Sequence, residues 1–240
     1  WAYYVAGFSF LLAVCTSIVM SGQLKHKSTD RMTLKRVLSG FLYVSQNKVV
    51  LGAVSIDLVA VLFGGVMGLL PIYASDILEV GPDGLGVMRA MPGIGALFMG
   101  LALAQIAHPR YVGITMFFTL ALFGGSIVIF SLSTVFWISL VALAIYGASD
   151  MVSVYIRLTL VQLATPDEMR GRVSAVNSIS INASNELGDF RAGLMASGFG
   201  TVPAVFLGGI ATFAVVGIWM KIFPDLVKIS GFDDVKNKIT

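Results

Sequence analysis

The sequence contains few charged residues and a single cysteine. Lys, Arg, Asp and Glu make up 12 % of its 240 residues, against about 25 % in soluble globular proteins. Cys15 has no second cysteine to pair with in the chain. An internal disulfide is therefore excluded, and a metal site built from thiolates is not expected.

The common catalytic motifs are also missing. The chain has no Walker phosphate-binding loop, no HExxH helix and no GxSxG turn. Its two histidines, His26 and His108, fall in segments expected to be loops. We therefore expect no enzyme activity, no cofactor and no metal.

Long apolar runs dominate what is present. Hydrophobic residues make up 57 % of the chain, and its mean hydropathy is +0.88. Because about 20 residues of helix cross the hydrocarbon core of a bilayer, each long run predicts a membrane-spanning helix. The sequence thus predicts an all-α membrane protein with seven transmembrane helices, at residues 1–20, 49–75, 85–107, 112–130, 135–163, 173–197 and 202–223.

Basic residues gather in alternate connections between these runs. Such connections face the cytoplasm in most membrane proteins, so the pattern predicts a cytoplasmic C-terminus. It also explains the net charge of +3 without a nucleic-acid partner. The basic residues concerned are Lys25, Lys27, Arg31, Lys35, Arg36, Lys48, Arg110, Arg170, Arg172, Lys221, Lys228, Lys236 and Lys238.

The chain divides into four parts. We expect a transmembrane helix at residues 1–20, a cytoplasmic loop at 21–48, a six-helix bundle at 49–224 and a cytoplasmic tail at 225–240. The loop contains an amphipathic pattern that fits either a helix at the membrane interface or a solvated linker helix. The six later spans form two triplets of opposite orientation, which is the arrangement of a 3+3 inverted repeat.

Polar residues recur within the sixth run at helical spacing. Ionisable groups inside a membrane usually face a bundle interior or a water-filled cavity, and Glu186 falls near the expected midplane. A carboxylate at that depth can carry a proton in a coupled transporter, whereas the alternative is a polar network that holds helices together. The stripe comprises Ser178, Asn182, Asn185, Glu186 and Asp189.

Four charged residues of the predicted spans, besides those of the stripe, have expected roles. Asp150, near the middle of its run, is a second candidate for binding protons. Asp57 and Arg157 fall at similar depths in different runs, so we expect them to form a structural ion pair, since neither charge is tolerable alone. Arg191 is expected to extend toward the outer membrane surface.

Three segments of the sequence resemble the C-terminal half of major facilitator superfamily permeases, in particular the enterobactin-exporter-like efflux branch. They are residues 51–74, 147–178 and 182–193. The resemblance implies that residues 1–20 are the sixth of twelve spans and that the later runs are spans seven to twelve. It also implies that Arg170 and Arg172 lie in the cytoplasmic turn between spans ten and eleven.

The resemblance further implies a multi-pass protein of the bacterial inner membrane that exports small molecules, siderophore-like or drug-like, by alternating access against a proton gradient. Its partners would be that substrate, the lipid bilayer and a missing N-terminal helical bundle. Residues 107–111 match the superfamily's cytoplasmic gating motif poorly, so gating contacts there are not expected. Two alternatives remain open: a non-transporting scaffold or truncated remnant, and an uptake permease of the same fold.

Overall fold

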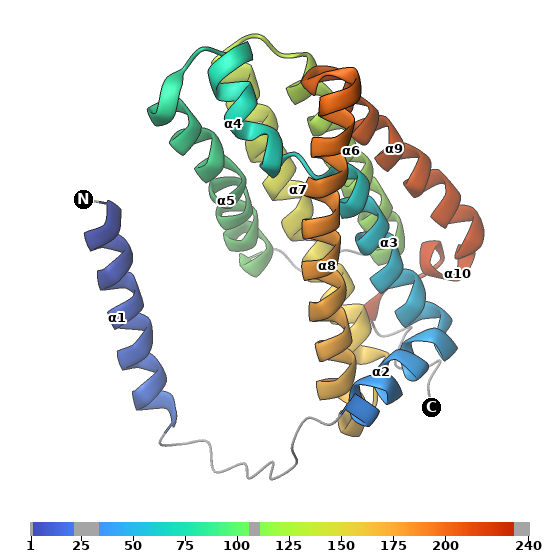
Figure 1. Cartoon of the computed structure of the whole chain (residues 1–240). Coiled ribbons are helices and arrows are strands. Elements are labelled where there is room, and N and C mark those ends of the chain that lie inside the picture. The colour runs from blue at the N-terminus through green and yellow to red at the C-terminus, as the bar shows by residue number, and fades with distance from the viewer. Residues whose placement is uncertain (1, 22–33, 106–110, 233–240) are drawn as a thin grey trace. The chain divides into compact units, whose positions relative to one another are not determined.

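A computed structural model describes residues 2–21, 34–105 and 111–232 (Figure 1). The chain separates into two units, residues 1–33 and 34–240. Among the described residues, the first unit contains one helix, α1 (Ala2–Ser21). Residues 107–110 of the segment compared with the gating motif lie outside the described residues.

The second unit is entirely helical within the described residues. It begins with a short amphipathic helix, continues through a span that is broken in its middle, and ends with five long helices and one short one. The elements are α2 (Leu34–Gln46), α3 (Lys48–Gly64), η1 (Met67–Leu69), α4 (Leu70–Ile72), η2 (Tyr73–Ile77), α5 (Gly81–Gln105), α6 (Val112–Leu132), α7 (Phe136–Leu163), α8 (Asp167–Phe199), α9 (Thr201–Ile222) and α10 (Pro224–Val227).

Five helices among the described residues are long and apolar enough to cross a membrane. The first combines α3, η1, α4 and η2 (Lys48–Ile77), and the others are α5, α6, α7 and α9. Two of the seven predicted spans are not among them: α1, some of whose side chains lie outside the described residues, and α8. In α8, charged and amide side chains are spread along the helix, which lowers its apolar character.

Helices α5 and α7 approach each other closely through glycine. A Cβ added at Gly95 would collide with the backbone carbonyl of Ala144, and one at Gly147 would collide with that of Pro92. Small residues allow helix backbones to approach in this way in membranes, where dispersion contacts drive helix association. Gly95 therefore packs at this contact, whereas Gly93 faces open space.

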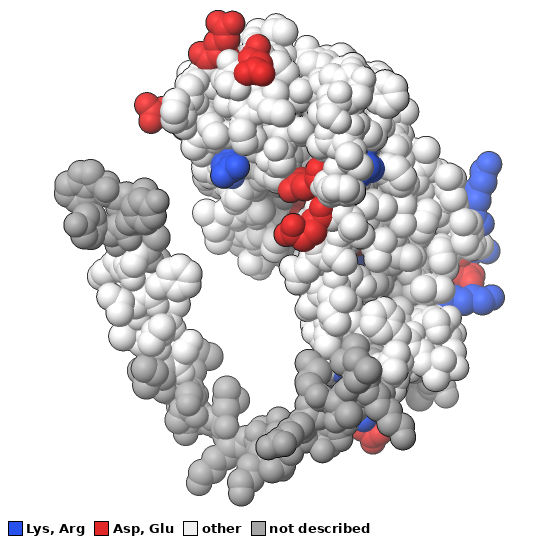
Figure 2. Space-filling model, viewed as in Figure 1, with Lys and Arg blue, Asp and Glu red and all other residues white. Residues whose placement is uncertain are grey.

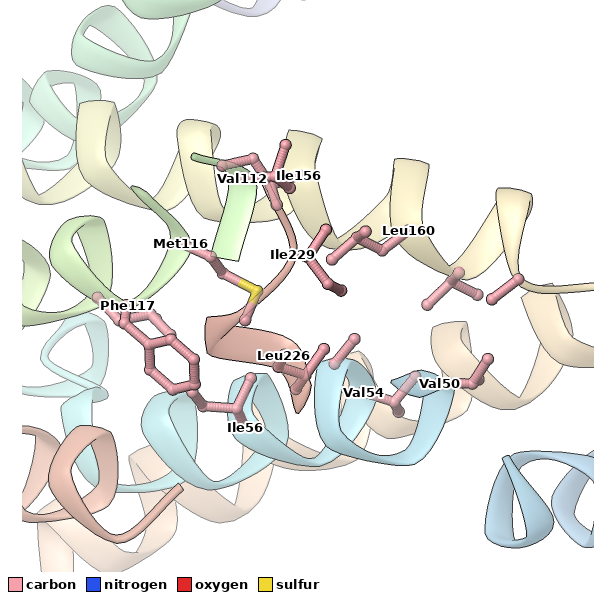
Figure 3. Packing of buried hydrophobic residues seen from close by; sticks show 14 of the residues in the cluster. Val50, Val54, Ile56, Val112, Met116, Phe117, Ile156, Leu160, Leu226 and Ile229 are labelled. Atoms are coloured by element: carbon pink, nitrogen blue, oxygen red, sulfur yellow. The ribbon is translucent and has the colours of Figure 1, made fainter. Parts of the chain in front are cut away.

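The start of the expected C-terminal tail belongs to the core. Leu226 and Ile229 are buried, and Figure 3 shows them between the Val54 side of α3 and the Ile156 side of α7. The backbone carbonyl of Ile229 also accepts a hydrogen bond from the amide of Gly113 at 3.0 Å. The first residues of the expected tail thus pack on the bundle, because their apolar side chains fill its end.

Helix α2 docks on the bundle by one face. The Tyr43 hydroxyl donates to the carbonyl oxygen of Ala164 at 2.7 Å, and Gly40 lies against the backbone of Arg172. The apolar side chains of Leu38 and Phe41 remain exposed. The predicted amphipathic helix therefore exists, with Leu38, Phe41 and Leu42 exposed and Val44 buried in the core.

The structure brings together the two charges predicted to pair. Arg157 of α7 and Asp57 of α3 form an ion pair whose side chains are 2 % and 6 % exposed. A pair this deep must neutralise itself, because a lone charge in the protein interior carries a large desolvation cost. The pair joins α3 to α7 within the larger apolar core.

Substitution of Gly95 tests the close approach of α5 and α7. Gly95→Ala should lower the free energy of unfolding by about 1–3 kcal/mol, because the added methyl group must push the two backbones apart. Gly93→Ala, two residues away with nothing near its Cβ, should be neutral or stabilising by up to about 1 kcal/mol. Thermal unfolding of the purified protein in detergent measures both, and equal melting temperatures would contradict the predicted contact.

Removal of one partner tests the buried ion pair. Asp57→Leu should destabilise the protein by about 3–5 kcal/mol, since it leaves Arg157 buried without a counter-charge. The double variant Asp57→Leu/Arg157→Met should recover most of that loss. Asp167→Ala is the control, because it breaks a surface pair with Arg170 whose side chains are 84 % and 52 % exposed and which is worth at most about 1 kcal/mol. A single variant as stable as the double variant would show that the pair is not required.

Candidate functional site

The polar stripe of α8 lies on the side of the helix that faces away from its own bundle. The side chains of Ser178, Asn182, Asn185 and Glu186 are exposed, and Asp189 is half-buried. Figure 2 shows acidic side chains midway along the face that α8 presents to the viewer. The opposite side of α8 is buried against α3 and α9.

The exposed part of the stripe makes few bonds to other helices. The Asn182 amide donates to the carbonyl oxygen of Ser178 at 2.9 Å, within α8 itself. The buried Ser184 hydroxyl likewise donates to the carbonyl oxygen of Ser180. Polar groups of the stripe are therefore available to whatever covers this face.

Asp189 differs from its neighbours because it contacts the broken span. Its Oδ1 accepts a hydrogen bond from the backbone amide of Gly68 at 3.1 Å. A Cβ at Gly68 would lie 3.1 Å from the Asp189 carboxyl carbon, and one at Gly65 would lie 3.5 Å from its Oδ1. The two glycines thus leave just enough room for the carboxylate to approach the main chain.

The contact falls where the span Lys48–Ile77 loses its helical form. Helix α3 ends at Gly64, Gly65 is extended with φ −60° and ψ 120°, and helical turns resume at Met67. A break of this kind leaves carbonyl oxygens at the end of one segment and amides at the start of the next without helical partners. In a membrane protein these groups need partners from neighbouring side chains.

Arg191 satisfies the other side of the same break. Its Nε donates to the carbonyl oxygen of Leu62 at 2.8 Å, and its Nη2 donates to that of Phe63 at 2.6 Å. The guanidinium also lies 5.6 Å from the centre of the Phe63 ring, and its Nη1 is 2.9 Å from the sulfur of Met195. The expectation that Arg191 extends toward the membrane surface is wrong, because the freed carbonyls of α3 offer it a closer set of acceptors.

The sequence contained a signal for this break that its interpretation missed. Gly64, Gly65 and Gly68, followed by Pro71, are residues that interrupt helices, but a span continuous over residues 49–75 was the expectation. The site is identified by two features together. A span is broken at membrane depth, and the helix opposite the break carries both an acidic and a basic residue.

Asp150 lies on α7, and its side chain is half-buried. Tyr146, one turn earlier on α7, stacks on Phe123 with the ring centres 4.4 Å apart. Among the described residues, no hydrogen bond or ion pair joins the three predicted proton-binding candidates Asp150, Asp189 and Glu186 to one another.

Arg170 and Arg172, which the resemblance implies for the turn before this helix, lie instead within the first two turns of α8 and are separate from this region. Arg170 pairs with Asp167 at 2.8 Å, and Arg172 donates to the Ser39 hydroxyl of α2 at 3.3 Å. A cavity of about 290 Å³ lies beside the turn, between the end of α7 and the start of α8, and the buried Asn177 lines it. Within the described residues no group of three or more His, Cys, Asp or Glu side chains is placed to hold a metal ion.

Comparison with known proteins gives a family and a set of distant relatives. The family model described as Major Facilitator Superfamily matches residues 1–189. The relatives include proteins named enterobactin exporter EntS from Escherichia coli O139:H28 (strain E24377A / ETEC), Shigella boydii serotype 18 and Escherichia fergusonii. Each is 24 % identical over 208 residues, which cover 86 % of this chain and 49 % of the relative.

The chain thus spans about half the length of the curated relatives it matches. No solved structure matches it significantly. The family match covers most of the chain, and the fold is helical with five helices able to cross a membrane by length and composition. This multi-pass membrane protein therefore belongs to the Major Facilitator Superfamily.

Proposed function

We propose that the chain is the C-terminal half of a transporter that exports small molecules in exchange for protons by alternating access. The observation that carries the proposal is the position of Glu186, exposed on the face of α8 that its own bundle leaves uncovered. An ionisable side chain at membrane depth is normally covered by protein or by water in a cavity, since contact with lipid is costly.

The cover in our proposal is a second helical bundle, which would close a central cavity against α8. The relatives are about twice as long as the matched region, which supports a missing N-terminal bundle. Their name, enterobactin exporter, supports export of a siderophore-like or drug-like molecule. The protein would lie in the bacterial inner membrane with a cytoplasmic C-terminus, as the distribution of basic loops favours.

Within that cavity the residues have different roles. Glu186 is the proposed protonation site, and Asp150 and Asp189 are further candidates for proton coupling. Asn182, Asn185 and Ser178 would line the cavity, where amide and hydroxyl groups both donate and accept hydrogen bonds. Asp57 and Arg157 neutralise each other in the core and are proposed to act structurally.

Neutralisation of Glu186 tests the proposed coupling. In the full-length transporter, Glu186→Gln should reduce proton-driven accumulation of substrate in inside-out vesicles to the background of vesicles that lack the protein. The reason is that an amide keeps the size of the side chain but cannot exchange a proton. The measurement is uptake of a catecholate siderophore or a fluorescent dye after the vesicle lumen is acidified.

Glu168→Gln is the matched control, because Glu168 is an exposed glutamate in the first turn of the same helix. That variant should accumulate substrate like the parent protein, and both variants should be present in the membrane in similar amounts. Normal proton-driven accumulation by Glu186→Gln would refute the assignment of Glu186.

A further inference from the structure

The break in the span Lys48–Ile77 is held from both sides by one short stretch of α8. Asp189 accepts a hydrogen bond from the backbone amide of Gly68. Gly68 lies near the start of the outer segment, residues 65–77, which follows the break. Two residues after Asp189, Arg191 donates to the carbonyl oxygens of Leu62 and Phe63, at the end of α3. Each side chain has the charge that suits its end of the break, because amides at a helix start attract anions and carbonyls at a helix end attract cations.

These contacts are short because the backbones approach closely. A Cβ at Gly188, which precedes Asp189, would lie 3.0 Å from the carbonyl oxygen of Val61. A Cβ at Gly208 on α9 would lie 2.5 Å from the carbonyl oxygen of Phe63 and 3.3 Å from Nη2 of Arg191. Glycines on α8 and α9 therefore leave the space in which the guanidinium and the carboxylate reach the main chain.

We propose that Asp189 and Arg191 are positioning residues that clamp this break, so that the outer segment, residues 65–77, stays docked to α8. Without the clamp, the carbonyls of Leu62 and Phe63 lose their donors in part-buried surroundings, and the exposed amide of Gly68 loses its acceptor. The outer segment would then open locally, while α3 on the other side of the break remains packed in the larger core.

The clamp bears on the proposed transport function but does not depend on its details. Asp189 lies one turn beyond Glu186 on α8, and it contacts the broken span at Gly68. If the protein works by alternating access, the outer segment and α8 would move as one unit. The role of Asp189 in this proposal is that of a hydrogen-bond acceptor for the main chain.

Cysteine accessibility in the full-length protein tests the clamp without any transport assay. Cys15→Ala removes the native cysteine of this chain, and Val66→Cys then places a thiol at the break, where Val66 is 1 % exposed. Val54→Cys is the matched control, since Val54 is 6 % exposed on the intact part of α3. Maleimide labelling is measured in membranes for each thiol, alone and combined with Asp189→Leu, Asp189→Asn or Arg191→Met.

We expect Asp189→Leu and Arg191→Met to speed labelling of Val66→Cys by roughly tenfold, since loss of a hydrogen-bond partner of the main chain shifts a local opening equilibrium by about that factor. Asp189→Asn keeps an acceptor oxygen of similar size and should label slowly, like the parent. Labelling of Val54→Cys should stay unchanged in all three backgrounds.

Unchanged labelling of Val66→Cys in both Asp189→Leu and Arg191→Met would overturn the clamp. A parallel rise at Val54→Cys would also overturn it, because it would indicate general unfolding. Failure of the proposed function is distinguishable, since normal transport by Glu186→Gln leaves these labelling rates untouched.

Discussion

The need to satisfy backbone hydrogen-bonding groups inside a membrane explains much of this bundle. A continuous helix satisfies its own amides and carbonyls, but the span Lys48–Ile77 is interrupted between Gly64 and Met67. The interruption is stable because α8 supplies a carboxylate for one side and a guanidinium for the other. Because α8 supplies these side chains, it carries more polar residues than its neighbours and is the least apolar of the long helices.

Five charged residues within the helices have three different physical roles. Asp57 and Arg157 neutralise each other in the core. Asp189 and Arg191 bind the main chain of a neighbouring span. Glu186 is exposed on the face of α8 that the bundle leaves uncovered, which is why we propose it as the protonation site.

Close backbone approach is the second constraint on the fold. Gly95 and Gly147 let α5 and α7 meet at their main chains, and Gly188 and Gly208 do the same around the break in the first span. Lipid offers apolar groups much the same surroundings as a protein interior does, so association of helices in a membrane depends on such packing. The glycines are thus what allows the polar contacts at the break to form.

The sequence by itself determined the helical fold, the approximate helix positions and the polar stripe, because apolar length and helical spacing are local properties of the chain. The Asp57–Arg157 pair was also predictable, since two isolated charges at similar depth need each other. Only the tertiary structure revealed the contacts of Asp189 and Arg191, because they depend on where the backbone of another span is interrupted. The tertiary structure also placed Leu226 and Ile229 in the core. The sequence did not predict this, because the short apolar segment after the last long helix, α9, shows no periodicity that would reveal its burial.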